Sequence, residues 1–230
     1  MTNEVGDRPQ VPTVRGEVAE LLRRALSKDY ISESCQDAIE TGNHYQSVEL
    51  GGAVSEGFRS SRSDLLDRIR FEGRSVLDLG SNLGEMSRGA RERGADLVDG
   101  FEYDSYFVEM ANLLNAYHAT TRVSFYERDI TDAGIYTETY DIVMALSVFI
   151  YARPVMETLA KITRDAFVLE THRIDGNLES FYLDAVLPHF PVYETLGETE
   201  WGNPHEDDDV VRSVMVFARD RSTLDAVLRQ

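Results

Sequence analysis

The stretch Ser75-Val-Leu-Asp-Leu-Gly-Ser-Asn-Leu-Gly-Glu85 decides the fold. A short apolar run that ends at Asp78 is followed by a turn with Gly80 and Gly84, and then by a helical pattern. Glycines permit a tight turn and let a ligand approach the backbone, while the free N–H groups at a helix start attract an anionic group. The spacing lacks the G-x-G-x-x-G of nicotinamide-dependent oxidoreductases, and no G-K-[ST] follows as in a P-loop.

Downstream of this stretch, short apolar runs alternate with helical patterns. The expected strands cover residues 76–79, 97–101, 123–126, 142–146 and 167–169, and the expected helices cover 85–93, 105–117, 154–163 and 178–187. Strands that alternate with helices form parallel crossovers, so the pattern predicts an α/β fold with a doubly wound sheet. Two further strand-like runs, 192–196 and 210–218, have no helix between them and are typical of an antiparallel hairpin.

Acidic residues follow two of the expected strands. Glu102 comes after the second strand, 18 residues beyond Gly84, where a carboxylate can accept hydrogen bonds from both hydroxyls of a ribose. Asp129 comes after the third strand and could accept a hydrogen bond from an exocyclic adenine amine. Either residue alone would be an ordinary solvated strand end, whereas the set with Asp78 predicts an adenosine-binding site.

At these residues the chain resembles the class I S-adenosylmethionine-dependent methyltransferases, over residues 70–219. The resemblance is carried by the segments VLDLGSNLG, GFEYD, ERDITD and YDIVMALSV and by the final pair of strands. It implies a Rossmann-like sheet of seven strands in the order 3-2-1-4-5-7-6, the last antiparallel, and S-adenosylmethionine as the cofactor. Asn82 stands where the commoner family turn has a third glycine, and asparagine tolerates unusual backbone angles.

The resemblance implies which residues surround the cofactor. The expected contacts are Asp78, Gly80, Ser81 and Gly84 at the methionine end, Glu102 and Tyr103 at the ribose, Asp129 and Ile130 at adenine, and Ser147 near the sulfonium and the substrate. From the N-terminal side, Tyr45 and Arg62 are expected to reach the methionine carboxylate or an anionic substrate. Helix capping and surface salt bridges are the alternative for these two residues.

The acceptor end is expected beyond the fourth and fifth strands. His172 is the best candidate for a general base, because an imidazole can take a proton at neutral pH, and Glu170 lies in the same segment. Capping of the next helix is the alternative for His172. Phe149, Tyr151 and Trp201 are the expected substrate contacts.

The composition disfavours several classes of partner and site. The 230 residues carry 23 basic and 41 acidic side chains, a net charge of −18, which disfavours nucleic acid and anionic lipid as partners. Cys35 is the only cysteine, so no internal disulfide is possible, and the acidic run at 205–209 reads as a solvated loop rather than a metal site. No apolar run approaches the about 20 residues of a membrane span, and no secretory signal is visible, so the cytoplasm is the expected setting.

The chain is expected to divide into three parts: residues 1–13 as a disordered N-terminus, 14–70 as an N-terminal helical cap with helices at 17–26, 30–40 and 61–69, and 71–230 as the methyltransferase domain. The cap and the acidic surface favour transfer of a methyl group to an oxygen or nitrogen of a small molecule, as in secondary-metabolite biosynthesis. An Asn/Asp-Pro-Pro-Tyr/Phe segment, typical of enzymes that methylate adenine or amide nitrogens, is missing after the fourth strand.

Two other functions stay open at this point. The arginines between 59 and 74, together with a loose likeness of that run to the family that carboxymethylates tRNA wobble uridine, allow an RNA-modifying enzyme. A non-enzymatic protein that binds S-adenosylmethionine is the other alternative. The oligomeric state is not set by the sequence, and a homodimer is one expectation.

Overall fold

The computed structural model describes residues 46, 48–50, 53–55, 62–171, 178–201 and 210–229. The expected disordered start and the expected helices at 17–26 and 30–40 lie outside these residues.

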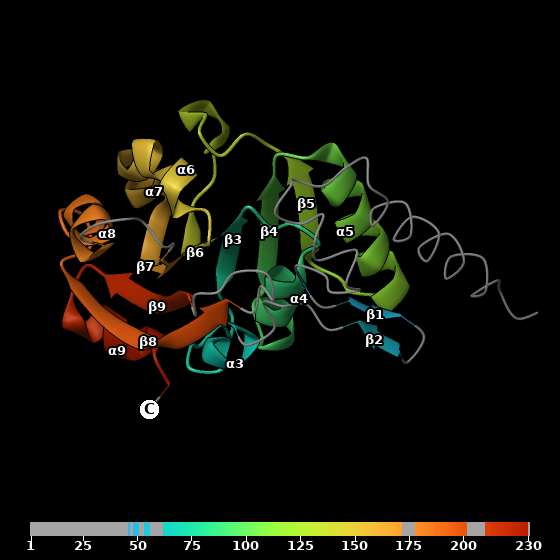
Figure 1. The fold of residues 1–230 in the computed structure, drawn as a ribbon, viewed down its shortest axis with the longest axis horizontal. Coiled ribbons are helices and arrows are strands. Elements are labelled where there is room, and N and C mark those ends of the chain that lie inside the picture. The colour runs from blue at the N-terminus through green and yellow to red at the C-terminus, as the bar shows by residue number, and fades with distance from the viewer. Residues whose placement is uncertain are drawn as a thin grey trace, which may run out of the picture.

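One sheet of seven strands organises the described chain (Figure 1). Its strands are β3 (Ser75–Leu79), β4 (Leu97–Glu102), β5 (Val123–Glu127), β6 (Tyr140–Leu146), β7 (Thr163–Glu170), β8 (Val192–Trp201) and β9 (Val210–Ala218). They lie in the order β5-β4-β3-β6-β7-β9-β8, and β9 is antiparallel to both of its neighbours. Numbered along the sheet-forming chain, this is 3-2-1-4-5-7-6 with the last strand antiparallel, so the expected topology is confirmed.

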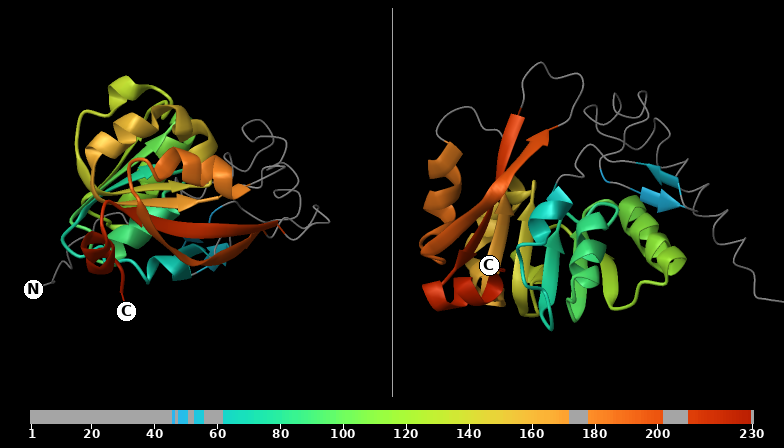
Figure 2. Two further views of the ribbon diagram at one scale, coloured as in Figure 1. Left: turned by 90° about the vertical axis from the view of Figure 1, so that its left-hand side faces the viewer. Right: turned by 90° about the horizontal axis from the view of Figure 1, so that it is seen from below.

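Helices cover both faces of the sheet, because each crossover buries its apolar face against the strands. One core contains side chains of α3 (Arg62–Leu66), α4 (Glu85–Glu92), α5 (Ser105–His118) and α9 (Arg221–Val227). The other contains side chains of α6 (Phe149–Ala152), α7 (Met156–Ile162) and α8 (Leu178–Val186). The left view of Figure 2 shows α7 and α8 on one side of the sheet and α9, in red, on the other.

Several boundaries differ from the expected ones. The helix expected at 61–69 is confined to α3, and the one expected at 154–163 begins as a 3-10 turn, Arg153–Val155, before α7. Strand β8 is five residues longer than expected, because it is an edge strand whose alternating polar residues hide the apolar pattern.

Some elements were not expected at all. Strands β1 (Val48–Leu50) and β2 (Ala53–Ser55) pair antiparallel in a stretch between two of the expected helices. Helix α9 and the 3-10 turn Ala133–Ile135 were likewise not predicted.

The end of α9 is tied to the chain that precedes the sheet. Arg70 donates its backbone N–H to the carbonyl of Val227 at 2.7 Å, and Arg229 donates to the carbonyl of Arg68 at 2.8 Å. Ile69 and Leu228 form an isolated antiparallel bridge, and both side chains are buried in the core with α3 and α4. The segment after α3 and the segment after β9 therefore close the same end of the domain.

Candidate functional site

A glycine turn joins β3 to α4 at the carboxyl edge of the sheet. Gly80 and Gly84 have φ values of 67° and 80°, in the left-handed region that favours glycine. A Cβ on Gly80 would lie 2.4 Å from Cγ1 of Val148, and one on Gly84 would lie 2.1 Å from Cζ of Phe125. Asn82 adopts a φ of 50°, as its expected tolerance of unusual angles allows. The turn therefore needs glycine at both positions, because the side chains of Val148 and Phe125 pack where a Cβ would lie.

Glu102, at the end of β4, is bonded to backbone N–H groups of two loops. Its Oε2 accepts from the N–H of Asn82 at 2.8 Å, and its Oε1 accepts from those of Tyr103 at 2.9 Å and Asp104 at 3.1 Å. Burial raises the pKa of Glu102, and these three bonds work in the opposite direction. The carboxylate thus lies beside the glycine turn, and its contact with a ribose stays a prediction.

Asp78, at the end of β3, is 2% exposed. Its Oδ2 accepts a hydrogen bond from Oγ of Ser87 at 2.6 Å. Burial raises the pKa of Asp78 to about 6, although the Ser87 bond and the positive charge of Arg62 lower it. This carboxyl group directly precedes the glycine turn, and its expected place at the methionine end of the cofactor stays a prediction.

Gln46 reaches the same turn from well before the sheet, and it was not among the expected site residues. Its side chain is buried; Nε2 donates to the carbonyl of Ser81 at 3.3 Å, and Oε1 accepts from the N–H of Glu85 at 3.2 Å. The N-cap residue of α4 is Gly84, which has no side chain to accept a hydrogen bond from the helix. Gln46 supplies this cap from a distant segment. In the sequence, only its position beside the predicted site residue Tyr45 indicated that Gln46 could belong to the site.

A cavity of about 420 Å³ opens above the strand ends. It is lined by Gly80, Asn82, Glu102, Tyr103, Asp129, Ile130, Thr131, Val148 and Tyr151. Oδ1 of Asp129 accepts from the N–H of Thr131 at 2.9 Å and from its hydroxyl at 2.7 Å, and these bonds lower the pKa of Asp129. The structure thus brings five of the expected cofactor residues to one hollow: Gly80, Glu102, Tyr103, Asp129 and Ile130.

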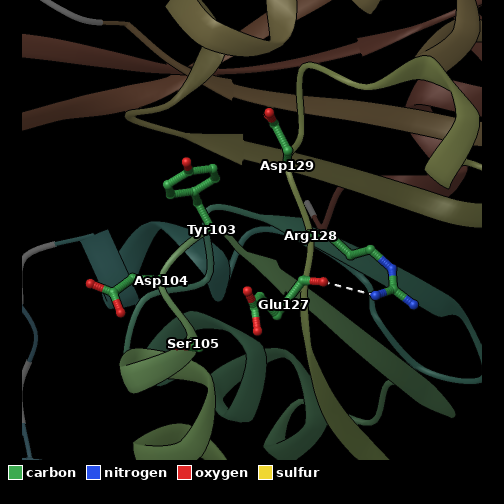
Figure 3. A pocket seen from close by; sticks show the side chains of 6 residues that line it. All are labelled: Tyr103, Asp104, Ser105, Glu127, Arg128 and Asp129. Atoms are coloured by element: carbon green, nitrogen blue, oxygen red, sulfur yellow. Dashed lines mark hydrogen bonds between the residues drawn. The ribbon is translucent and has the colours of Figure 1, made fainter.

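A second hollow of about 420 Å³ adjoins the first and shares Tyr103 and Asp129 with it. Figure 3 shows its lining residues, including the carboxylates of Asp104 and Glu127. Arg128 turns back and donates to the carbonyl of Glu127 at 2.8 Å. Three carboxylates around the opening make it a negatively charged surface.

A buried polar cluster, here called the strand-end network, occupies the acceptor side of the same edge. Its members are Arg62, Ser147, Glu170, Thr199 and Arg212. Glu170 accepts from Nη1 of Arg62 at 3.2 Å, from Oγ1 of Thr199 at 2.7 Å and from the hydroxyl of Ser147, which in turn accepts from Nη1 of Arg212 at 3.0 Å. Arg62 therefore pairs with Glu170, and Ser147 is bonded inside the protein.

Two acceptor-side expectations need correction. Phe149 is fully buried, with its ring 6.0 Å from Phe167 and 5.5 Å from Tyr182, so it belongs to the core and does not face a substrate. Glu170, expected at the acceptor end beside His172, is also fully buried and does not line the cavity, since its carboxylate is bonded inside the strand-end network. Tyr151, by contrast, is 57% exposed and lines the cavity, and its contact with a substrate stays a prediction.

The remaining expected residues divide by where they lie. Ser81 is buried within the glycine turn and Gly84 packs under it, although neither lines the cavity. Tyr45 and His172 lie outside the described residues, as does the side chain of Trp201, which ends β8. Within the described part of the chain, no group of three or more His, Cys, Asp or Glu side chains is arranged to hold a metal ion. No helix in that part is long and apolar enough to cross a bilayer.

Sequence comparison yields one relevant relative. No family model matches the chain. The ribosomal protein L11 methyltransferase of Dictyoglomus turgidum is 38% identical over 108 residues, which are 47% of this chain and 31% of that protein. The match therefore spans less than a third of the relative's length.

Solved structures match more of the chain at low identity. The N-terminal domain of EvdMO1, in the presence of SAH and D-fucose, has a TM-score of 0.61 at 14% identity, covering 93% of this chain and all of that one. Magnesium protoporphyrin IX methyltransferase (ChlM) from Synechocystis PCC 6803 with bound SAM has a TM-score of 0.58 at 16% identity and covers 95% and 100%. The bifunctional kinase-methyltransferase WbdD has a TM-score of 0.57 at 18% identity and covers 72% and 41%. The chain has the class I methyltransferase fold.

Proposed function

We propose that this chain is an S-adenosylmethionine-dependent methyltransferase that acts on a small molecule. The observation that carries the proposal is the cavity at the carboxyl edge, where the glycine turn, Glu102 and Asp129 meet. Ligands of doubly wound sheets bind at this edge, near the point where the strand order reverses. Here that point lies between β3 and β6. Strand β3 pairs with β4 on its other side.

The residues present fit this cofactor. Gly80 lets Val148 pack against the turn, Glu102 offers carboxylate oxygens beside it, and Asp129 and Ile130 line the same cavity, where they would flank the adenine. The carboxylates of Asp78 and Glu102 also place negative charge near a ligand that carries a sulfonium and an ammonium group. When bound, S-adenosylmethionine supplies an electrophilic methyl group.

The chain's own residues would then act mainly by positioning. Alignment of the acceptor with the methyl group can lower the activation free energy by several kcal/mol, as the positioning of two reactants does in other enzymes. Tyr151 stands on the cavity wall and would contact the acceptor or cover it from water. We propose His172 as the base that removes a proton from an acceptor hydroxyl or ammonium group, and Trp201 as a second acceptor contact.

Support for a small acceptor comes from charge and from the cavity mouth. The net charge of −18 disfavours RNA, and the exposed rings of Tyr103 and Tyr151 suit a planar or apolar acceptor. A protein acceptor is the second candidate, because the sequence relative with 38% identity bears the name of a ribosomal protein methyltransferase.

Calorimetric titration with S-adenosylhomocysteine tests the cofactor, with NAD as the control. We expect micromolar binding of the first and no heat from the second; binding of NAD alone would overturn the proposal. Transfer of a labelled methyl group from S-adenosylmethionine is then measured with small-molecule extracts, purified ribosomal protein L11 and tRNA in parallel. Label found only in L11 or only in tRNA would replace the small-molecule acceptor with that class.

A further inference from the structure

We infer that Glu170 is a positioning residue that acts through Ser147 to fix the turn carrying Val148 and Tyr151 to the cofactor cavity. The inference rests on the proposed function, since it takes this cavity to be the cofactor site. It gives the strand-end network a role in binding, although Glu170 itself does not line the cavity.

The turn after β6 has an unfavourable backbone. Ser147 has a φ of 65°, in the left-handed region where the Cβ of an L-residue crowds its own carbonyl. The residue is buried, so bonds inside the protein have to hold it there. Its hydroxyl donates to Oε2 of Glu170 and accepts from Nη1 of Arg212 at 3.0 Å. A serine is thus kept in a conformation that a glycine would adopt without help.

Glu170 is itself held from several elements, so its carboxylate is a fixed point for this turn. Arg62 of α3 donates to Oε2 at 3.2 Å, and Thr199 of β8 donates to Oε1 at 2.7 Å. The side chain of Glu170 is fully buried, and charged hydrogen bonds are strong in such surroundings. The bond from Ser147 is therefore made to an acceptor with little freedom to move.

The segment that Ser147 holds in place contributes two residues to the cavity wall. The next residue, Val148, packs over the glycine turn, since a Cβ on Gly80 would lie 2.4 Å from its Cγ1. The carbonyl of Val148 accepts from the N–H of Tyr151 at 2.9 Å, which starts α6 and places Tyr151 on the cavity wall. A shift of the turn would therefore move two residues that line the cavity.

Two substitutions around one carboxylate separate positioning from stability. Glu170→Gln removes the negative charge and leaves one acceptor oxygen for three donors, so the hydrogen bond from Ser147 is weakened. Thr199→Val removes different bonds, to the other oxygen and to the carbonyl of Arg212, and leaves the hydroxyl of Ser147 in place. Melting temperature and calorimetric affinity for S-adenosylhomocysteine are measured for both variants and the unaltered chain. We expect both variants to melt earlier. Only Glu170→Gln should lose affinity, by about tenfold, while Thr199→Val stays within about twofold.

The inference is overturned if Glu170→Gln binds like the unaltered chain, or if Thr199→Val loses as much affinity. Should Glu170→Gln not fold, Ser147→Ala and Ser147→Gly take its place. Both lose the hydroxyl, but only glycine tolerates the left-handed turn, so the alanine variant should bind more weakly. Equal affinities of these two variants would also overturn it. Failure of the unaltered chain to bind would instead count against the proposed cofactor.

Discussion

Replacement of Asp78 by asparagine should make the protein more stable and its cofactor site weaker. The side chain is 2% exposed at the end of β3, and burial raises its pKa from 3.8 to about 6. The folded protein therefore holds the Asp78 proton more tightly than the unfolded chain does. The stability contributed by the protonated form is fully present below pH 4 and is lost as the pH rises through 6.

The size of the effect follows from that shift. About two pKa units correspond to about 3 kcal/mol of unfolding free energy once the pH exceeds 7, and to about half of that at pH 5. Asparagine does not titrate, and its carbonyl oxygen can still accept the hydrogen bond of Ser87. Asp78→Asn should accordingly exceed the unaltered protein in stability by up to about 3 kcal/mol at pH 7 and by about 1.5 kcal/mol at pH 5.

Urea unfolding at pH 5, 6, 7 and 8, at constant ionic strength, measures this difference, and titration with S-adenosylhomocysteine at pH 7.5 measures the site. Ser87→Ala is the matched control, because it removes a bond that lowers the pKa of Asp78. The pH range over which this variant loses stability should therefore lie higher than in the unaltered protein. A stability difference that does not change between pH 5 and 8 would refute the argument from burial. Unchanged affinity of Asp78→Asn would remove Asp78 from the site.

Three further predictions concern single residues. Gly80→Val should abolish binding of S-adenosylhomocysteine, because its Cβ would meet Val148; calorimetry checks this against Gly73→Ala, which has a similar φ of 72° but open space around the new Cβ. Gln46→Ala should weaken binding about fivefold, since the turn loses two hydrogen bonds worth about 1 kcal/mol net, and an unchanged titration would contradict it. His172→Ala should slow methyl transfer at least about tenfold without changing cofactor affinity, and full turnover would exclude His172 as the base.

The fold could be predicted from local patterns because a doubly wound sheet repeats one unit. Alternating apolar runs and helical faces indicate the crossovers, and the two strands without a helix between them indicate the reversal at β9. Glu102 and Asp129 could be found in the same way, since the ends of neighbouring parallel strands meet at one edge.

The acceptor side could not be predicted as well, because its geometry depends on one turn and on distant partners. The expected strand end at Leu146 is correct, but the left-handed Ser147 redirects the chain and turns Phe149 into the core. The pairing of Arg62 with Glu170 joins residues 108 positions apart, and nothing in either segment indicates the other. Periodicity describes neighbours along the chain, and these contacts are not between neighbours.

The strand order also has a consequence for synthesis. Strand β9 lies between β7 and β8, so until it is made, β7 keeps one edge unpaired and β8 has no partner in the sheet. A nascent chain in which β3 to β7 have assembled therefore exposes the free edge of β7, which can pair with other chains. The hydrogen bonds of Val227 and Arg229 to the segment before β3 form later still. The interval between the synthesis of β7 and that of β9 is therefore the stage at which this topology is most open to pairing with another chain.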